Sequence, residues 1–210
     1  MVTKEMVIEW VKAYAQVIAE NEAYLTDLDR QIGDADHGAN MQRGFKAVLN
    51  KLPAAEEKEL SAVLKTVGMT LLSTVGGAGG PLYSTLFMKA GNVFAGKEEF
   101  GLQDWIQALE AGYTGIVTLG KAQPGDKTML DALRPAIDAL IEAEKAGESF
   151  PDALEKSSQA AHAGMLATIP LVARKGRASY LGQRSADHQD PGATSTTLLL
   201  ETATKTWAKA

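Results

Sequence analysis

Hydrophobic residues recur every three to four positions along most of this chain, which is the period of an amphipathic α-helix. No segment shows the alternating pattern that is typical of a half-buried strand. Thr3 precedes the first apolar stripe and has a side chain that suits an N-cap. This stripe consists of Met6, Trp10, Val11, Tyr14, Val17 and Ile18. The pattern therefore predicts an all-α fold.

The helical period, with proline and glycine near the boundaries, predicts about eight helices. They are expected over residues 6–18, 40–52, 60–73, 82–94, 102–119, 129–146, 151–168 and 194–207. Pro53 should stop the second helix and Gly147 should cap the sixth. The connections are short, so consecutive helices should be antiparallel neighbours in one bundle or barrel. No linker or change in composition divides the chain, and residues 1–210 are expected to form a single domain.

Four polar loops that are rich in glycine interrupt the helical pattern. They cover residues 29–40, 76–80, 120–128 and 176–194. In an up-and-down bundle, successive loops alternate between the two ends. These four loops follow the first, third, fifth and seventh predicted helices, so they should lie together at one end. The sequence therefore predicts one functional site built from loops at that end.

The first of these loops holds three carboxylates within eight residues, on Asp29, Asp34 and Asp36. His37 and Asn40 follow them directly. Clustered carboxylates repel one another unless a cation lies between them, and oxygen ligands suit Mg²⁺ or Ca²⁺. An exposed acidic turn is the alternative interpretation. The glycine-rich character of the other three loops favours a site for a divalent cation.

The second loop, Gly76–Gly80, leads into a helix whose first turn contains Pro81. Glycines let backbone N–H groups approach phosphate oxygens, and a helix N-terminus adds positive potential. A flexible turn is the simpler interpretation when this loop is taken alone. Beside an acidic cluster, phosphate binding becomes the favoured one.

The last loop combines a basic segment with a polar turn. Arg177 can hold phosphate in a bidentate manner, and Asp190 can contact a ribose hydroxyl or orient Arg177. Residues 174–190 are long for a connection between helices, which raises the hypothesis of a lid over a bound ligand. His37 can donate to a phosphate or bond to backbone. His162 lies within a predicted helix and is expected to be structural.

Composition excludes several classes of function. The net charge of −5 argues against nucleic acid or an anionic membrane as the main partner. The absence of cysteine excludes disulfides, thiolate metal sites and a cysteine nucleophile. The chain has neither a signal-peptide pattern nor a run of about 18 apolar residues, so a cytoplasmic location is expected. The three tryptophans are expected in the core or in an interface.

Four motifs carry a family resemblance that extends from Trp10 to Thr197. They are LDRQIGDADHGANMQRGF, GMTLLSTVGGAGGPLYSTLF, GKAQPGDKTMLDAL and ARKGRASYLGQRSADHQDPGATS, in this order. They resemble the nucleotide-binding subunit of dihydroxyacetone kinases, and most closely the separate ADP-binding subunit of the enzymes that depend on phosphoenolpyruvate. The resemblance implies a barrel of eight antiparallel amphipathic helices, which agrees with the helix count above.

The resemblance also implies the roles of individual residues. Asp29, Asp34 and Asp36 would hold two Mg²⁺ ions that bridge the phosphates of ADP or ATP. The residues expected around the nucleotide are His37, Gly38, Ala39, Asn40, Gly77, Ala78, Gly79, Gly120, Met129, Arg177, Asp190 and Gly192. Many relatives have serine where Gly79 stands here, so a hydroxyl contact to phosphate is expected to be replaced by a backbone N–H.

The function implied by the resemblance is that of a phosphotransferase subunit. Bound ADP would be phosphorylated in place by a phosphohistidine on a partner from the phosphotransferase system. The resulting ATP would pass its phosphoryl group to dihydroxyacetone, held on a separate substrate-binding subunit. Two alternatives stay open: a kinase component that exchanges ATP and acts on a related ketose or tetrose, and an ADP-loaded module that docks on a transcription regulator. The sequence does not decide between a monomer and a homodimer.

Overall fold

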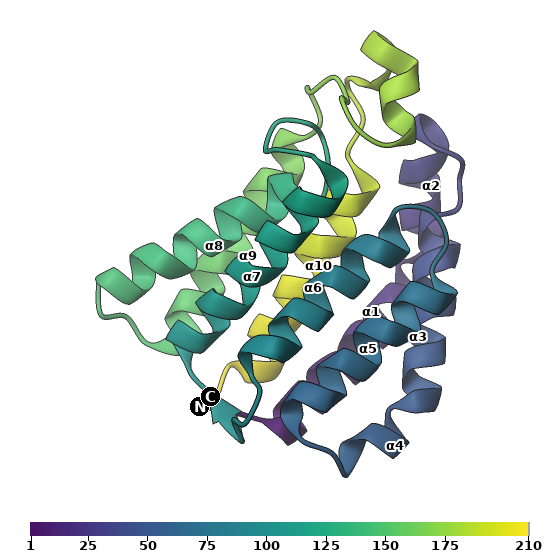
Figure 1. Cartoon of the computed structure of the whole chain (residues 1–210). Coiled ribbons are helices and arrows are strands. Elements are labelled where there is room, and N and C mark those ends of the chain that lie inside the picture. The colour runs from purple at the N-terminus through teal and green to yellow at the C-terminus, as the bar shows by residue number, and fades with distance from the viewer. Residues whose placement is uncertain (210) are drawn as a thin grey trace.

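The computed structural model describes residues 1–209, and the last residue of the predicted 1–210 domain lies outside this range. Within it the chain is almost entirely helical, which confirms the all-α prediction (Figure 1). The α-helices are α1 (Lys4–Glu20), α2 (Glu22–Ile32), α3 (His37–Lys51), α4 (Pro53–Glu56), α5 (Leu60–Thr74), α6 (Gly79–Val93), α7 (Leu102–Gly120), α8 (Leu130–Lys145), α9 (Phe150–Ala167) and α10 (Pro191–Trp207). A 3₁₀ helix, η1, covers Arg177–Ser185.

The long helices form a closed ring. Each packs against the next along the chain, and α10 packs against α1 to complete the ring. The helices α1 and α2 follow one another across a single-residue break at Asn21, whose N–H bonds to the carbonyl of Val17 at 3.0 Å. The N–H of Leu25 in turn bonds to the carbonyl of Asn21 at 2.9 Å. With α1 and α2 counted as one bent rod and the single-turn α4 left aside, the described residues form the eight rods that the sequence predicts.

The structure corrects the predicted loop 29–40. Asp29 lies in the last turns of α2, a helix that the sequence analysis did not identify, and residues 37–40 form the first turn of α3. The helix buries Leu25, Leu28 and Ile32 at helical spacing, but polar residues fill most of its other positions. The connection therefore contains only residues 33–36. A short connection restricts where the carboxylates can lie.

Two further details differ from the sequence prediction. The helix α3 ends directly before Pro53, as predicted, but Pro53 also begins the single-turn helix α4, where a first-turn proline needs no N–H partner. Two short strands also exist, β1 (Val2–Thr3) and β2 (Glu99–Phe100), and they pair antiparallel. Each strand has only two residues, too few to produce an alternating pattern in the sequence.

Several helix boundaries have the predicted physical causes. The Thr3 Oγ1 atom accepts a hydrogen bond from the N–H of Met6 at 3.4 Å and so caps α1. Ser149 caps α9 in the same way. Gly147 follows the end of α8 with a φ of +70°, a conformation that favours glycine at this position.

An aromatic cluster fills the barrel near the end that holds both termini. The ring of Trp207 lies 5.0 Å from those of Trp10 and Trp105 and 5.6 Å from Phe100, measured between centroids. Each of these rings is buried. The Nε1 atom of Trp207 donates to the carbonyl of Met6 at 3.1 Å, so the last helix is tied to the first. Of the two places predicted for the tryptophans, the core or an interface, the structure shows the core.

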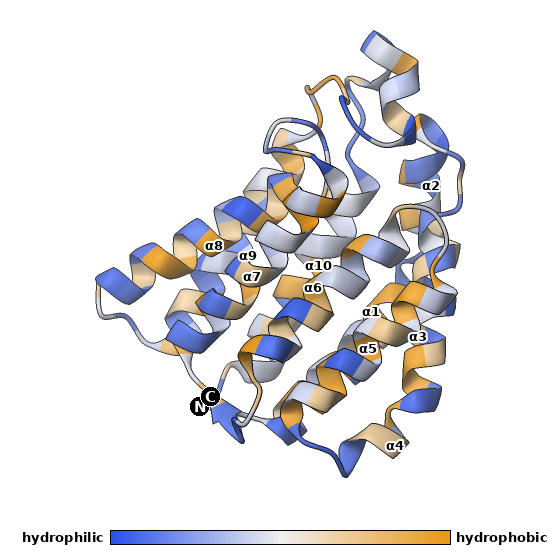
Figure 2. Cartoon of the chain, viewed as in Figure 1, coloured by the Kyte–Doolittle hydropathy of each residue, from blue (hydrophilic) through white to orange (hydrophobic). Residues whose placement is uncertain are grey.

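The four connections α2–α3, α5–α6, α7–α8 and α9–α10 lie at the opposite end of the barrel (Figure 1). This confirms the topological argument that places them together. Hydrophobic and hydrophilic residues alternate along helices such as α8, as expected for helices that cover a core on one side (Figure 2). Among residues 1–209, no helix combines the length and the apolar character needed to cross a lipid bilayer.

Candidate functional site

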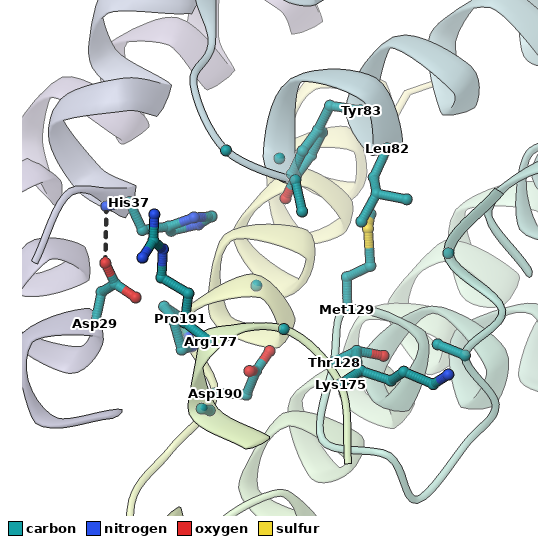
Figure 3. Close-up of a pocket in the computed structure, with 18 of the residues that line it drawn as sticks. Asp29, His37, Leu82, Tyr83, Thr128, Met129, Lys175, Arg177, Asp190 and Pro191 are labelled. Carbon is teal, nitrogen blue, oxygen red and sulfur yellow. Dashed lines mark hydrogen bonds between the residues drawn. The ribbon is translucent and has the colours of Figure 1, made fainter. Parts of the chain in front are cut away.

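A cavity of about 460 Å³ opens at the loop end of the barrel. All four connections contribute to its wall. Charged residues such as Asp29 and Arg177 lie on one side, and the apolar side chains of Leu82 and Met129 lie on the other (Figure 3). The predicted site residues that line it are Asp29, Asp34, Asp36, His37, Asn40, Gly77, Ala78, Gly79, Gly120, Met129, Arg177, Asp190 and Gly192. The acidic side of the cavity therefore suits a cation, and an anionic group of a ligand could bind there through such a cation, with an apolar group beside Leu82 and Met129.

Two predicted contact residues lie outside the cavity wall. Gly38 faces α2, and a Cβ atom at this position would lie 2.0 Å from the carbonyl oxygen of Glu22. Ala39 is exposed on the first turn of α3. Gly38 thus allows α3 to start in close contact with α2.

The carboxylates of Asp29, Asp34 and Asp36 converge at the acidic side of the cavity. One oxygen of each lies within 4.8 Å of the others. Asp29 is buried, and its Oδ2 atom accepts the backbone N–H groups of Asp36 at 2.8 Å and His37 at 3.2 Å (Figure 3). The end of α2 is thereby fixed against the start of α3. Three converging carboxylates form an all-oxygen donor set that fits Mg²⁺.

Arg177 provides a positive charge next to this cluster. Its Nε atom lies 2.8 Å from the Oδ2 atom of Asp34. Asp190 does not orient this arginine. It is buried and caps α10 instead, since its Oδ2 atom accepts the N–H of Ala193 at 2.7 Å. Arg177, which lies in η1, therefore reaches the carboxylate cluster, while Asp190 forms part of the cavity wall.

The imidazole ring of His37 is bonded to a buried network of hydroxyl groups that the sequence did not reveal. Its Nε2 atom lies 2.9 Å from the Oγ atom of Ser195, which lies 2.7 Å from the hydroxyl of Tyr83. Burial lowers the pKa of His37, although the charges of Asp29 and Asp36 oppose this shift. The imidazole is thus fixed in orientation and favoured in its neutral form. No local motif connects these three positions, which belong to three different helices.

The glycine-rich connection before α6 is shaped by close backbone contacts. Gly77 has a φ of +62°, in the region that favours glycine. A Cβ atom on Gly80 would lie 2.3 Å from the carbonyl oxygen of Val75, so no side chain fits there. The first turn of a helix has N–H groups without helical partners, and here this turn borders the cavity. These features agree with the predicted phosphate contact.

Arg43 ties this connection to α3. Its Nε atom donates to the carbonyl of Thr74 at 2.9 Å, and its Nη2 atom donates to the Oδ1 atom of Asn40 at 2.5 Å. Asn40 lies against Gly76, where a Cβ atom would be 3.1 Å from its Nδ2 atom. The glycine-rich connection and the start of α3 are therefore held at a fixed separation.

The connection between α7 and α8 is organised by Asp131. Its Oδ1 atom accepts the N–H of Gly125 at 2.5 Å, and its Oδ2 atom accepts the N–H of Thr128 at 2.7 Å. The spacing Thr128-x-x-Asp131 is a helix-start signal that the sequence does contain. Lys127, which also lines the cavity, has no such signal.

The substitution Gly38→Ala is expected to disturb the arrangement of the three carboxylates without removing any of them. The added methyl group meets the backbone of α2, and this overpacking should cost about 1–3 kcal/mol of stability. The start of α3, with Asp36 and His37, should shift away from Asp29 and weaken the binding of Mg²⁺ with nucleotide. Urea unfolding and calorimetric titration measure the two effects. Gln42→Ala, at an exposed position of α3, is the control. Unchanged binding in Gly38→Ala would refute this role.

The stability of the ligand-free protein should depend on pH through Asp190. Burial raises the pKa of this carboxyl from 3.8 to about 7, and the charged groups that act on it are Lys127, which lowers its pKa, and Asp131, which raises it. The buried Tyr83 also faces it. Because the folded pKa lies above the unfolded one, this contribution is complete below about pH 4 and is lost as the pH rises towards 7.

Relative to Asp190→Asn, the wild-type protein should therefore lose roughly 1 kcal/mol of stability for each pH unit in this range. Urea unfolding of both proteins at pH 5 and pH 7, in the presence of a chelator, measures this difference. A difference between the two proteins that does not change with pH would show that Asp190 is charged throughout.

The fold and the acidic cavity define the class of this protein as an all-α barrel with a cluster of three carboxylates at one end. The chain belongs to the DAK2 domain family, whose model matches residues 31–205. It is 44% identical to the ADP-binding subunit DhaL of the PEP-dependent dihydroxyacetone kinase of Escherichia coli (strain K12), over 95% of each chain. It is 42% identical to the ADP-binding subunit DhaL of the PTS-dependent dihydroxyacetone kinase of Lactococcus lactis subsp. lactis (strain IL1403), over 96% of this chain and 97% of the relative.

Longer proteins share the same domain. The chain is 35% identical to the L-erythrulose 1-kinase of Mycolicibacterium smegmatis and covers 34% of it. The crystal structure of the dihydroxyacetone kinase from C. freundii in complex with AMP-PNP and Mg²⁺ superposes with a TM-score of 0.72 and 25% identity. This match includes 96% of the present chain and 34% of the kinase. The helical barrel is therefore one part of those larger enzymes.

Proposed function

We propose that this chain is the ADP-binding subunit of a dihydroxyacetone kinase and acts as a phosphotransferase component. The observation that carries the proposal is the convergence of Asp29, Asp34 and Asp36 at one side of a cavity that has the apolar side chains of Leu82 and Met129 on its other side. The names of the relatives support a bound ADP, and the ligands of the superposed kinase support Mg²⁺ with an adenine nucleotide.

In this proposal the three aspartates hold two Mg²⁺ ions against the phosphates. Bound Mg²⁺ would neutralise the negative charge that develops on the transferred phosphoryl group. The glycine-rich connection and the first turn of α6 would bind phosphate oxygens through backbone N–H groups. Leu82 and Met129 would enclose the adenine ring beside Gly120. The remaining predicted contacts, His37, Asn40, Arg177, Asp190 and Gly192, would border the phosphates and the ribose.

The chain's own residues would act mainly by positioning and by charge. Two backbone N–H groups hold the Asp29 carboxylate in place before any ion binds, so little reorganisation is needed on binding. Arg177 would add its positive charge to that of the Mg²⁺ ions at the phosphates and would bring η1 over the cavity. We assign no general base to this chain. The group that activates the acceptor hydroxyl, if one is needed, belongs to the substrate-binding partner.

The proposal includes two partners and a compartment. A separate subunit would hold dihydroxyacetone, and a phosphohistidine protein of the phosphotransferase system would recharge the bound ADP in the cytoplasm. The terms PEP-dependent and PTS-dependent in the names of the relatives support such a donor. Docking of the ADP-loaded form on a transcription regulator is kept as an additional role with no observation in its favour.

A kinase component that exchanges ATP and acts on another ketose is the second candidate. The 35% identity to an L-erythrulose 1-kinase favours it. The higher identities, 44% and 42%, are to subunits that bind ADP, which is why the first proposal is preferred.

Reconstitution tests the proposed function. The purified chain replaces the ADP-binding subunit in a mixture of the other components of the E. coli enzyme, with phosphoenolpyruvate and dihydroxyacetone. We expect dihydroxyacetone phosphate to form without added ATP. Formation of product only when ATP is supplied in stoichiometric amounts would favour the second candidate instead.

A further inference from the structure

Lys127 is a buried lysine whose ammonium group bonds to main-chain carbonyls. Its side chain is among the largest fully buried ones, with 1% of its surface exposed. Its Nζ atom donates to the carbonyls of Thr168 at 2.9 Å, Ile169 at 3.3 Å, Leu171 at 3.0 Å and His188 at 2.5 Å. Among residues 1–209, no carboxylate forms a salt bridge with it. A buried cation is costly unless it is well solvated, and here the carbonyls take the place of water.

The four carbonyls lie at the two ends of one segment. Residues 168–171 come before the lid, whose bounds the structure shifts from the predicted 174–190 to residues 172–187, and His188 comes directly after it. The lid contains η1 and carries Lys175 and Arg177 to the cavity. One ammonium group therefore fastens both ends of the lid at a single point.

The other hydrogen bonds at this point are between neutral groups, and one of them joins the N–H of Asp190 to the Oγ1 atom of Thr168 at 3.0 Å. The N–H of Asp187 bonds to the carbonyl of Ile169 at 2.8 Å, which closes the base of the lid. The N–H of Arg174 bonds to the carbonyl of Asp126 at 3.1 Å. Hydrogen bonds from a charged donor are stronger than these, and Lys127 makes them to both ends of the lid.

Lys127 also belongs to the wall on the apolar side of the cavity. It lies in the connection between α7 and α8, two residues before Met129 and seven after Gly120. Asp131 fixes this connection through the N–H groups of Gly125 and Thr128. The lysine thus joins the wall proposed for the adenine ring to the lid that carries Arg177.

We propose that Lys127 is a positioning residue that couples the lid to the apolar wall and thereby sets the residence time of Mg²⁺-bound nucleotide. This inference rests on the proposed function and extends it to a residue that does not have to touch the phosphates. When the ammonium group is present, the lid and the wall move as one unit, and a bound nucleotide leaves only when the whole unit opens. Without it, the lid can open while the wall stays in place.

The test compares Lys127→Met, which keeps most of the length of the side chain without its charge, with the wild-type protein. Lys145→Met, at an exposed position of α8 far from the cavity, is the matched control. Hydrogen exchange of the nucleotide-free proteins should show at least tenfold faster exchange over residues 168–190 in Lys127→Met, with α1, α3 and α5 unchanged. Should this variant fail to fold, Lys127→Gln, whose amide keeps two N–H donors, takes its place with the same readouts.

The second readout is the dissociation rate of a fluorescent ADP analogue in the presence of Mg²⁺. We expect Lys127→Met to release it at least tenfold faster, with no change in the Mg²⁺ concentration that supports half-maximal binding. Wild-type exchange at the lid, wild-type release, or faster exchange spread evenly over the barrel would each overturn the inference. Absence of ADP binding by the wild-type protein would refute the proposed function instead, while hydrogen exchange of the nucleotide-free proteins would still decide whether Lys127 fastens the lid.

Discussion

The Asp34→Ala variant is expected to lose phosphoryl transfer by roughly a thousandfold, which corresponds to about 4 kcal/mol of transition-state stabilisation. Two effects add to this loss. One of the three convergent carboxylates is removed from the cation site, and Arg177 loses the partner that lies 2.8 Å from its Nε atom. Binding of ADP should weaken as well, because the remaining carboxylates hold Mg²⁺ less firmly.

The measurement is the rate of product formation in the reconstituted enzyme, together with calorimetric titration of ADP in the presence of Mg²⁺. Asp27→Ala is the control, because Asp27 lies on α2 close to the site but is exposed and pairs with Arg30. Asp27→Ala should behave like the wild-type protein. Full activity of Asp34→Ala in the same mixture would rule out the metal role assigned to this aspartate.

Trp207→Ala is expected to lower the free energy of unfolding by about 3–5 kcal/mol, the cost typical of removing a large buried aromatic side chain. The residue lies near the end of the chain, but its ring is fully buried between Trp10 and Trp105. Its N–H also ties α10 to the start of α1. Loss of this side chain should therefore weaken the closure of the ring.

Urea unfolding followed by circular dichroism measures this effect, with Lys205→Ala as an exposed control on the same helix. The free energy of unfolding of Trp207→Phe should lie between those of Trp207→Ala and Lys205→Ala, because phenylalanine keeps part of the packing and loses the hydrogen bond. A change below about 1 kcal/mol in Trp207→Ala would mean that α10 does not close the ring as described.

Much of the fold follows from the hydrophobic period of the sequence. The period of the long helices, with Pro81 and Gly147 near their ends, was sufficient to predict the order of the rods and the end at which the polar connections lie. The helix α2 was not predicted because its apolar residues are few and most of its remaining positions are polar. The strands were not predicted because two residues form no recognisable pattern.

The residues that line the cavity were predictable where they crowd together along the chain or belong to one of the four loops and their motifs. Asp29, Asp34 and Asp36 led to the prediction of a cation site because their carboxylates crowd together along the chain, and the structure shows that these carboxylates converge. Whether Gly38 faces the cavity or α2 depends on how α3 packs against α2, and the sequence alone does not contain that contact. Lys127 likewise acts on residues that lie at least 41 positions away in the sequence, so only the folded chain reveals its role.

The most direct test of the proposed function is the identity of the nucleotide released when the purified protein is denatured, with no nucleotide added beforehand. Chromatography of the released material should show about one ADP per chain, retained through dialysis in buffer that contains Mg²⁺. This result would identify ADP as a resident cofactor that is recharged in place. A protein that is empty after purification and exchanges ATP freely would contradict it.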